Sequence, residues 1–215
     1  VHLDQQLLLL LNGSDSLYWD GFWVSITRVA TWIFFYLFLL LVLLRSYDYR
    51  RVGLIVLMVG VAILLADQGA SGICKPLVQR FRPSHEPALA GLVDLVDGRR
   101  GGLYGFFSSH AANTASVAVF VSLLARRRLC YAVFATWVLL NCWTRVYLGV
   151  HYVGDLLCGL LCGVLVGWSV NLALRRWVSS YRASLPFSDF ESHLLTLSFL
   201  FTTLFVSLFS FVYAA

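Results

Sequence analysis

Charged side chains are scarce in this sequence. Of its 215 residues only 13% are Asp, Glu, Lys or Arg, and Lys75 is the single lysine. Soluble domains carry about a quarter charged residues, because polar groups must cover much of their surface. A chain that is 60% hydrophobic, with a mean hydropathy of +0.79, has too little polar surface for that. The composition therefore excludes an ordinary soluble domain and predicts an integral membrane protein.

The sequence also lacks the patterns of zinc-binding and nucleic-acid-binding proteins. Its five cysteines are an odd set without zinc spacing, and they define no disulfide. They are Cys74, Cys130, Cys142, Cys158 and Cys162. The net charge of +5 is not arranged as a basic stripe interleaved with aromatic residues, so we expect no nucleic-acid partner. The positive charge falls in short clusters between apolar runs, where membrane topology explains it.

Six apolar segments are long enough to cross a bilayer, which takes about 20 helical residues. They are 24–44, 52–73, 108–125, 129–146, 153–174 and 192–213. The length suits one helical bundle with no attached soluble domain. We therefore predict an all-α polytopic membrane bundle of about six transmembrane helices. Residues 1–215 would form one domain, with a helical core at 24–174 and an additional C-terminal span at 192–213.

The N-terminal segment, residues 1–23, differs from the spans. Its apolar run is only five leucines, closed by Asn12 and Gly13. Four aromatic residues follow: Tyr18, Trp19, Phe22 and Trp23. Such residues gather where a membrane meets water. We predict a short interfacial helix here, not a spanning helix or a cleavable signal.

The distribution of lysine and arginine predicts the orientation. One set of connections carries nine arginines: Arg45, Arg50, Arg51, Arg126, Arg127, Arg128, Arg175, Arg176 and Arg182. The other set carries seven basic residues: Arg28, Lys75, Arg80, Arg82, Arg99, Arg100 and Arg145. Lys75, Arg82 and Arg145 suit phosphate binding, and without them this side has four basic residues against nine on the other. The nine-arginine side is then cytoplasmic, and both termini and the 74–107 loop face outward, into the periplasm of a bacterial inner membrane.

Three polar segments interrupt the apolar sequence on the outward side. They are KPLVQRFRP at Lys75–Pro83, FFSSH at Phe106–His110 and TRVYLGVHYVGD at Thr144–Asp155. Each lies at the end of a predicted span, so all three come to the same membrane surface although they are far apart in the sequence. This placement is what a single site would require.

The residue types in these segments suit a phosphate group. Lys75, Arg82 and Arg145 place three cations at one depth, and guanidinium groups match phosphate oxygens in paired hydrogen bonds. Ser108 and Ser109 open a helix and can cap it, while the free backbone N–H groups of its first turn form an anion cradle.

Two histidines and an aspartate complete the site. His110 would stand beside the bound anion, placed to give up a proton. His151 and Asp155 are four residues apart, hence on one helix face, so the carboxylate can hold one ring nitrogen as N–H and leave the other free to attack. Arg145, six residues before His151, would face elsewhere on a continuous helix. We therefore predict a break at Gly149.

Several polar residues near the site are assigned structural roles. We expect Arg80, Arg99 and Arg100 to anchor the chain to lipid headgroups. Asp67 lies within a span, where a charge is costly. It is two helical turns before Lys75 and would support a basic residue beneath the site.

A metal centre is a further possibility that the charges disfavour. His110, His151 and Asp155 could ligate zinc. Three permanent cations at the same place would repel a divalent ion and supply much of its electrostatic effect. We expect neither a metal nor a cofactor.

The three segments together resemble the type 2 phosphatidic acid phosphatase superfamily, which includes bacterial lipid phosphatases, glucose 6-phosphatase and vanadium haloperoxidases. The shared pattern is Lys-x6-Arg-Pro, then Ser-x-His, then Arg-x5-His-x3-Asp. The matching residues are Lys75, Arg82, Pro83, Ser108, His110, Arg145, His151 and Asp155. The sequence departs from the usual motifs where Phe107 replaces proline, Ser109 replaces glycine and Thr144 replaces serine.

This resemblance implies a role for each matching side chain. His151 would be the nucleophile and would form a phosphohistidine, with Asp155 orienting it. His110 would protonate the leaving oxygen and later help to activate water. The residues binding the phosphoryl group would be Lys75, Arg82, Ser108, Ser109 and Arg145.

The predicted function is dephosphorylation of a membrane lipid at the outer face. The motifs bind only phosphate, so undecaprenyl diphosphate, phosphatidylglycerol phosphate, lipid A phosphates and phosphatidic acid are all candidates. We favour undecaprenyl diphosphate, because its recycling is the commonest task of similar bacterial proteins, with lipid A close behind. A phosphotransferase using another acceptor is the alternative. A lipid transporter fits poorly, because transport sites lie near the midplane. The sequence leaves the oligomeric state open.

Overall fold

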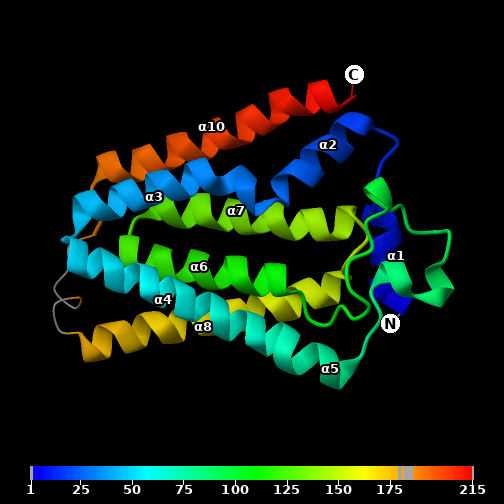
Figure 1. Ribbon diagram of the computed structural model, residues 1–215, viewed down its shortest axis with the longest axis horizontal. Coiled ribbons are helices and arrows are strands. Elements are labelled where there is room, and N and C mark those ends of the chain that lie inside the picture. Colours follow the sequence, from blue (N-terminus) through cyan, green and yellow to red (C-terminus); the bar gives the residue numbers. More distant parts are fainter. Residues whose placement is uncertain (1, 179–180, 182–185, 215) are drawn as a thin grey trace.

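The structure, a computed structural model, describes residues 2–178, 181 and 186–214. The longer helices run side by side in one bundle (Figure 1). The α-helices are α1 (His2–Leu11), α2 (Leu17–Ile26), α3 (Ile33–Ser46), α4 (Tyr49–Asp67), α5 (Lys75–Val78), α6 (Ser109–Ala125), α7 (Arg128–Tyr147), α8 (Val153–Trp177) and α10 (Asp189–Ala214). Shorter turns are η1 (Val29–Trp32), η2 (Gln68–Cys74, a π-helix), η3 (Pro83–His85), η4 (Pro87–Leu89) and η5 (Val96–Gly98).

The predicted all-α membrane bundle is confirmed. Among the residues that the structure describes, five helical segments are long and apolar enough to cross a membrane: Val29–Ser46, Tyr49–Val78, Arg128–Tyr147, Val153–Trp177 and Asp189–Phe211. The remaining predicted span corresponds to α6, an apolar helix of 17 residues that packs against α4, α7 and α8. At 1.5 Å per residue α6 is about 25 Å long.

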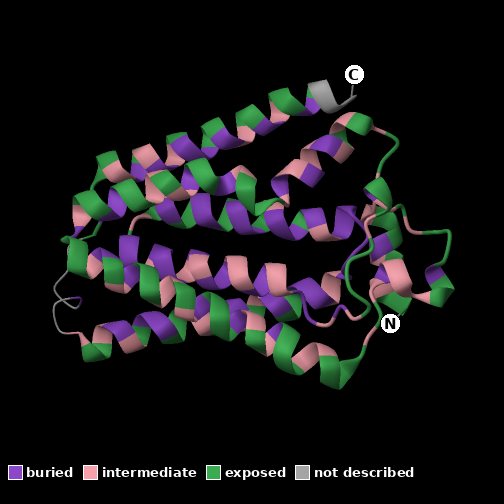
Figure 2. Cartoon of the chain, in the orientation of Figure 1, coloured by how far each residue is buried: buried purple, intermediate pink, exposed green. Residues whose placement is uncertain are grey.

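The outer faces of the bundle are apolar. Large side chains such as Leu204, Phe205 and Leu208 of α10 are exposed, and Figure 2 shows exposed residues along the outward sides of α3, α8 and α10. Such a surface is costly in water and is suited to lipid chains. The chain is therefore an integral membrane protein.

The N-terminal segment forms two helices instead of one. α1 lies across the end of the bundle, whereas α2, which carries the aromatic residues, packs along α10 and α7 (Figure 1). The hydroxyls of Tyr18 and Ser207 are 2.7 Å apart, and Trp23 packs beside Tyr147. α2, η1 and α3 thus act as one broken helix beside α10. This break places Thr27 inside the bundle, near the polar segments.

Three glycines bring α8 close to α6. The sequence repeats a small residue at every fourth position of α8, a pattern that permits close helix packing. A Cβ atom added to Gly159 would lie 2.6 Å from the Ser108 carbonyl oxygen, and one added to Gly163 would lie 2.3 Å from that of Ala112. Because these neighbours are backbone atoms, they cannot move aside cheaply.

We predict that Gly163→Val separates α6 from α8 and lowers the free energy of unfolding by about 3 kcal/mol, the upper range for overpacking. Thermal unfolding in detergent measures the effect. Gly60→Val on α4 is the matched control, because a Cβ there meets open space. The control should keep or raise the midpoint, and an unchanged midpoint for Gly163→Val would contradict the packing described.

Candidate active site

The three polar segments meet at one end of the bundle. α5, the start of α6 and the connection from α7 to α8 lie there, and α1 packs against α7 and α8 at the same end (Figure 1). The arginine-rich connections between α3 and α4 and between α6 and α7 lie at the opposite end. Arg182, the last of the nine expected there, lies outside the described residues.

The predicted helix break is present at Gly149. α7 ends at Tyr147, and Gly149 has a φ of +65°, which favours glycine. A Cβ there would also lie 2.5 Å from a methyl carbon of Val93. The Arg145 backbone carbonyl accepts hydrogen bonds from the backbone N–H groups five and six residues later, the second of which is His151 (3.2 Å). The break therefore turns His151 back toward Arg145.

His151 and Asp155 form a buried pair. Their side chains are 2% and 0% exposed, and His151 Nδ1 lies 3.4 Å from Asp155 Oδ2. On the other side of the ring, Arg82 Nη1 lies 2.9 Å from Nε2. A guanidinium can only donate, so Nε2 is the acceptor and Nδ1 carries the proton that faces the carboxylate. This is the tautomer that a nucleophilic Nε2 requires.

The surroundings of His151 keep the ring neutral. Burial lowers its pKa well below the ordinary value of 6.5, and the positive charges of Arg82, Arg145 and Lys75 lower it further. A neutral ring retains a lone pair at neutral pH. All three predicted cations therefore act on this histidine.

Arg82 is positioned by a short extended segment. Gln79, with a φ of 50°, ends α5, and the following residues pair with the chain before α6. The backbone N–H of Arg82 donates to the Leu103 carbonyl at 3.0 Å, and the backbone N–H of Gly105 donates to the Arg80 carbonyl at 2.9 Å. A Cβ on Gly105 would lie 3.1 Å from Arg82 Cγ and 3.2 Å from Asp155 Oδ2, so only glycine fits there without displacing both groups.

Lys75 is held against the start of α6. Its Nζ donates to Ser109 Oγ at 2.5 Å and to Ser71 Oγ at 2.9 Å. Ser71 Oγ lies 3.4 Å from Asp67 Oδ1. Asp67 therefore supports Lys75 through a serine one turn away from each, as the structural role assigned to it requires. The sequence analysis missed Ser71, although its position four residues before Lys75 places it on the same helix face.

Ser108 and His110 occupy the first turn of α6. Ser108 is fully buried, and its Oγ accepts from the Ala111 N–H at 3.5 Å, as an N-cap does. The Ser108 N–H donates to the Asp155 carbonyl at 3.1 Å, which joins α6 to α8. The next two N–H groups of α6 have no acceptor within the helix. The His110 ring hydrogen bonds to the backbone of Thr27.

Two guanidinium donors in this cluster are unsatisfied. Arg145 Nη1 donates to Thr27 Oγ1 at 2.7 Å, but its Nε is buried with no partner among the described residues. Arg82 Nε is in the same state. Buried donors without partners are rare in native proteins because each costs about 1–3 kcal/mol, more when charged. An oxyanion bound between the two arginines would satisfy both.

The prediction that Arg80 anchors the chain to lipid headgroups is wrong. Arg80 Nη1 lies 3.0 Å from Asp155 Oδ1, and Nη2 lies 2.8 Å from Asp4 Oδ2. The guanidinium also stacks on Tyr152, with Cζ 4.0 Å from the ring centroid. The sequence analysis missed Asp4 and Thr27, because no spacing relates the N-terminal helices to the three polar segments.

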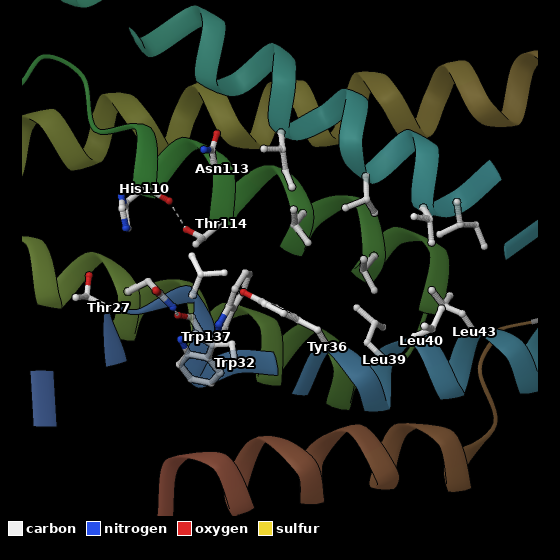
Figure 3. Close-up of a pocket in the computed structure, with 18 residues that line it drawn as sticks. Thr27, Trp32, Tyr36, Leu39, Leu40, Leu43, His110, Asn113, Thr114 and Trp137 are labelled. Atoms are coloured by element: carbon white, nitrogen blue, oxygen red, sulfur yellow. Dashed lines mark hydrogen bonds between the residues drawn. The ribbon is translucent and has the colours of Figure 1, made fainter. Parts of the chain in front are cut away.

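An apolar groove leads away from His110. It has a volume of about 410 Å³ and is lined by α3, α4, α6 and α7. Figure 3 shows it running from Thr27 and His110 to Leu40 and Leu43, at the opposite end of α3. Along α6 it extends from His110 to Val121, about 16 Å at 1.5 Å per residue. The site thus opens into a channel with the polarity of a lipid chain.

Metal ligands are not grouped in the part of the chain that the structure describes. No three His, Cys, Asp or Glu side chains there are close enough together to hold an ion. The arrangement instead offers a neutral imidazole nitrogen, three cations and a helix N-terminus around one small space. These groups can bind a phosphoryl group and accept it on nitrogen.

Comparison with known proteins agrees with this geometry. Residues 51–179 match the model of the PAP2 superfamily, which is more than half of the chain. The chain belongs to the PAP2 superfamily. The match begins in α4 and ends just after α8, so it includes the three polar segments and leaves out α1, α2, α3 and α10.

Two curated relatives cover more of the chain. A lipid A 4′-phosphatase of Bacteroides thetaiotaomicron is 40% identical over 86% of this chain and 82% of its own. A lipid A 4′-phosphatase of Porphyromonas gingivalis is 34% identical over 84% and 78%. A solved phosphatidylglycerolphosphate phosphatase of Bacillus subtilis shares the fold, with a TM-score of 0.56, 22% identity and coverage of 81% and 84%. The chain is therefore a membrane phosphatase that acts on a lipid.

Proposed function

We propose that this protein removes the 4′-phosphate of lipid A through a phosphohistidine at His151. The observation that carries the phosphate part of this proposal is the pair of buried, unsatisfied Nε donors of Arg82 and Arg145 beside a neutral histidine. Both curated relatives are named for lipid A, which favours this lipid over undecaprenyl diphosphate, the substrate that the sequence alone favours.

In the first step, His151 Nε2 attacks phosphorus and the bond to the lipid oxygen breaks. Binding of the phosphate draws the Arg82 guanidinium from Nε2 to the phosphate oxygens, which frees the nitrogen lone pair. Asp155 stabilises the positive charge that develops on the imidazole. His110 donates its proton to the leaving oxygen, so the lipid departs as an alcohol.

In the second step, water attacks the phosphohistidine. His110, now neutral, accepts a proton from the water, and the bond between phosphorus and Nε2 breaks to return the neutral His151 ring. Lys75, Arg82 and Arg145 stabilise the charge on the equatorial oxygens in both steps, as do the N–H groups at the start of α6. No group outside the chain and the two substrates is needed to balance the reaction.

The groove beside His110 supports a lipid substrate. Its lining is mostly apolar, and the groove lies between helices that span the membrane. A phosphate at the arginines could therefore be bound while a chain of the same lipid lies along α6. A phosphotransferase would use the same intermediate, and the choice between water and an alcohol as acceptor distinguishes the two activities.

We predict that His151→Ala lowers kcat about a thousandfold or more, because the atom that receives phosphorus is lost. Asp155→Asn should lower kcat about a thousandfold, since an amide stabilises neither the tautomer nor the charged ring. Phosphate release by the purified protein measures both. Asp15→Asn, at an exposed position of the N-terminal segment, is the control. His151→Ala activity within about tenfold of the unmodified protein would remove His151 as the nucleophile.

The substrate is tested with a lipid panel in detergent. We expect lipid A carrying 1- and 4′-phosphates to be hydrolysed at the 4′ position, with kcat/KM about tenfold or more above undecaprenyl diphosphate, phosphatidylglycerol phosphate and phosphatidic acid. A chelator should not change the rate, because cations of the chain supply the stabilising charge. Faster hydrolysis of undecaprenyl diphosphate, or activity lost in chelator and restored by a divalent metal, would contradict the proposal.

We also propose that the site faces the periplasm of a bacterial inner membrane. The arginine-rich end of the bundle would be cytoplasmic by the positive-inside rule. In a variant without the five native cysteines, Arg100→Cys should react with a membrane-impermeant thiol reagent in intact cells, and Arg50→Cys only after permeabilisation. Both side chains are exposed: Arg50 is in the first turn of α4, and Arg100 is in the connection that leads to α6, and the starts of these two helices lie at opposite ends of the bundle (Figure 1). The reverse labelling pattern would place the chemistry in the cytoplasm.

A further inference from the structure

We propose that helix α1 takes part in the reaction through two positioning residues, Asp4 and Arg80, which hold the Asp155 carboxylate in the orientation that His151 needs. This inference rests on the proposed role of Asp155. It assigns to the N-terminal helix, which lies outside the part of the chain that matches the PAP2 superfamily, a function in catalysis.

The two oxygens of Asp155 have different partners. Oδ2 faces His151 Nδ1 at 3.4 Å and accepts from the Tyr152 N–H at 3.1 Å. Oδ1 accepts from Arg80 Nη1 at 3.0 Å. The contact with the histidine is long for a hydrogen bond, so a small rotation of the carboxylate would lose it. Arg80 opposes that rotation, because it fixes the oxygen on the far side.

Arg80 is itself fixed by α1. Its second nitrogen, Nη2, donates to Asp4 Oδ2 at 2.8 Å, and its plane stacks on Tyr152. The other oxygen of Asp4 accepts from the Gly154 N–H at 2.9 Å, in the first turn of α8. Asp4 therefore binds both Arg80 and the helical turn that carries Asp155. A side chain at Gly154 would collide with Asp4, since a Cβ there would lie 2.7 Å from Oδ2.

Arg80 and Arg82 contact different members of the buried pair: Arg80 contacts Asp155, and Arg82 contacts His151. They are two residues apart in an extended segment and therefore project to the same side, while Phe81 between them stacks on Tyr104. Arg82 contacts His151 Nε2, where phosphorus would bind. Both terminal nitrogens of Arg80 are instead occupied by carboxylates. Arg80 thus acts on the reaction through Asp155 and not through the phosphate.

α1 has a second attachment that does not involve Asp4. Asn12 Nδ2, just after the helix, donates to the Tyr147 carbonyl at 2.7 Å, and Asn12 Oδ1 accepts from the Asp94 N–H at 2.7 Å. Leu8, a residue of α1, is also fully buried. The carboxylate of Asp4 can therefore be changed while α1 stays docked, which separates its effect on catalysis from an effect on folding.

The test uses Asp4→Asn and Arg80→Gln in the full chain, each alone and combined with Asp155→Asn. We expect kcat to fall about tenfold for Asp4→Asn and about a hundredfold for Arg80→Gln, with KM and inhibition by vanadate changed by less than about twofold. Arg80→Lys, which retains the charge, should recover about tenfold over the glutamine variant. In the Asp155→Asn background neither change should lower kcat by more than about twofold, because residues that act through one group are not additive.

Controls separate this inference from its premise and from misfolding. Asp15→Asn and Arg100→Gln, at exposed positions, should keep the unmodified rate, and thermal unfolding in detergent checks that each variant is folded. If a variant unfolds, Asp4→Glu and Arg80→Lys provide the same comparison with the charge retained. Normal activity of Asp155→Asn would refute the proposed function of that residue.

Three results would overturn the inference itself while Asp155→Asn remains impaired. The first is an unchanged kcat for Asp4→Asn and Arg80→Gln. The second is a full multiplicative loss when Arg80→Gln is added to Asp155→Asn, which would mean that Arg80 acts independently of Asp155. The third is a large rise in KM and in the vanadate inhibition constant, which would make Arg80 a phosphate ligand.

Discussion

The constraint on which the catalytic end depends is the complete burial of the Asp155 carboxylate. A buried charge costs several kcal/mol unless it is paired and hydrogen-bonded. The hydrogen bonds from Arg80 and from the Tyr152 N–H offset that cost. The remaining contact of the carboxylate, with His151, fixes which ring nitrogen carries the proton. The backbone carbonyl of Asp155 accepts a hydrogen bond from the Ser108 N–H, so the position of Asp155 also fixes the start of α6.

Close helix packing and phosphate chemistry are therefore linked. The glycines of α8 let its backbone approach α6, which brings the capped start of α6 beside the break at Gly149. The three cations come from other elements: Lys75 from α5, Arg82 from an extended segment and Arg145 from α7. An anion bound at the unsatisfied Nε donors of Arg82 and Arg145 would offset the mutual repulsion of the cations. The adjoining groove then accounts for a substrate that stays in the membrane.

Local motifs made the arrangement at the centre of the site predictable, whereas the contacts around it could not be predicted. The spacing of His151 and Asp155, the need for a break at Gly149 and the small residues of α8 follow from helix periodicity alone. Arg80 was misassigned because its partner Asp4 is 76 residues away in the sequence. Nothing in a single sequence reports such a tertiary ion pair. Similarly, the aromatic residues of α2 indicated a membrane interface, but whether that helix lies on the bundle or packs into it depends on α10.

The most direct test of the account is to find where phosphate is attached to the enzyme during turnover. The protein would be mixed with lipid A carrying radiolabelled phosphates, quenched in alkali within one turnover, and digested to map the label. The account predicts an acid-labile, alkali-stable phosphohistidine at His151, formed and lost at rates that match kcat. A covalent label at His110 or Ser109, or rapid turnover with no labelled enzyme at any time, would contradict it.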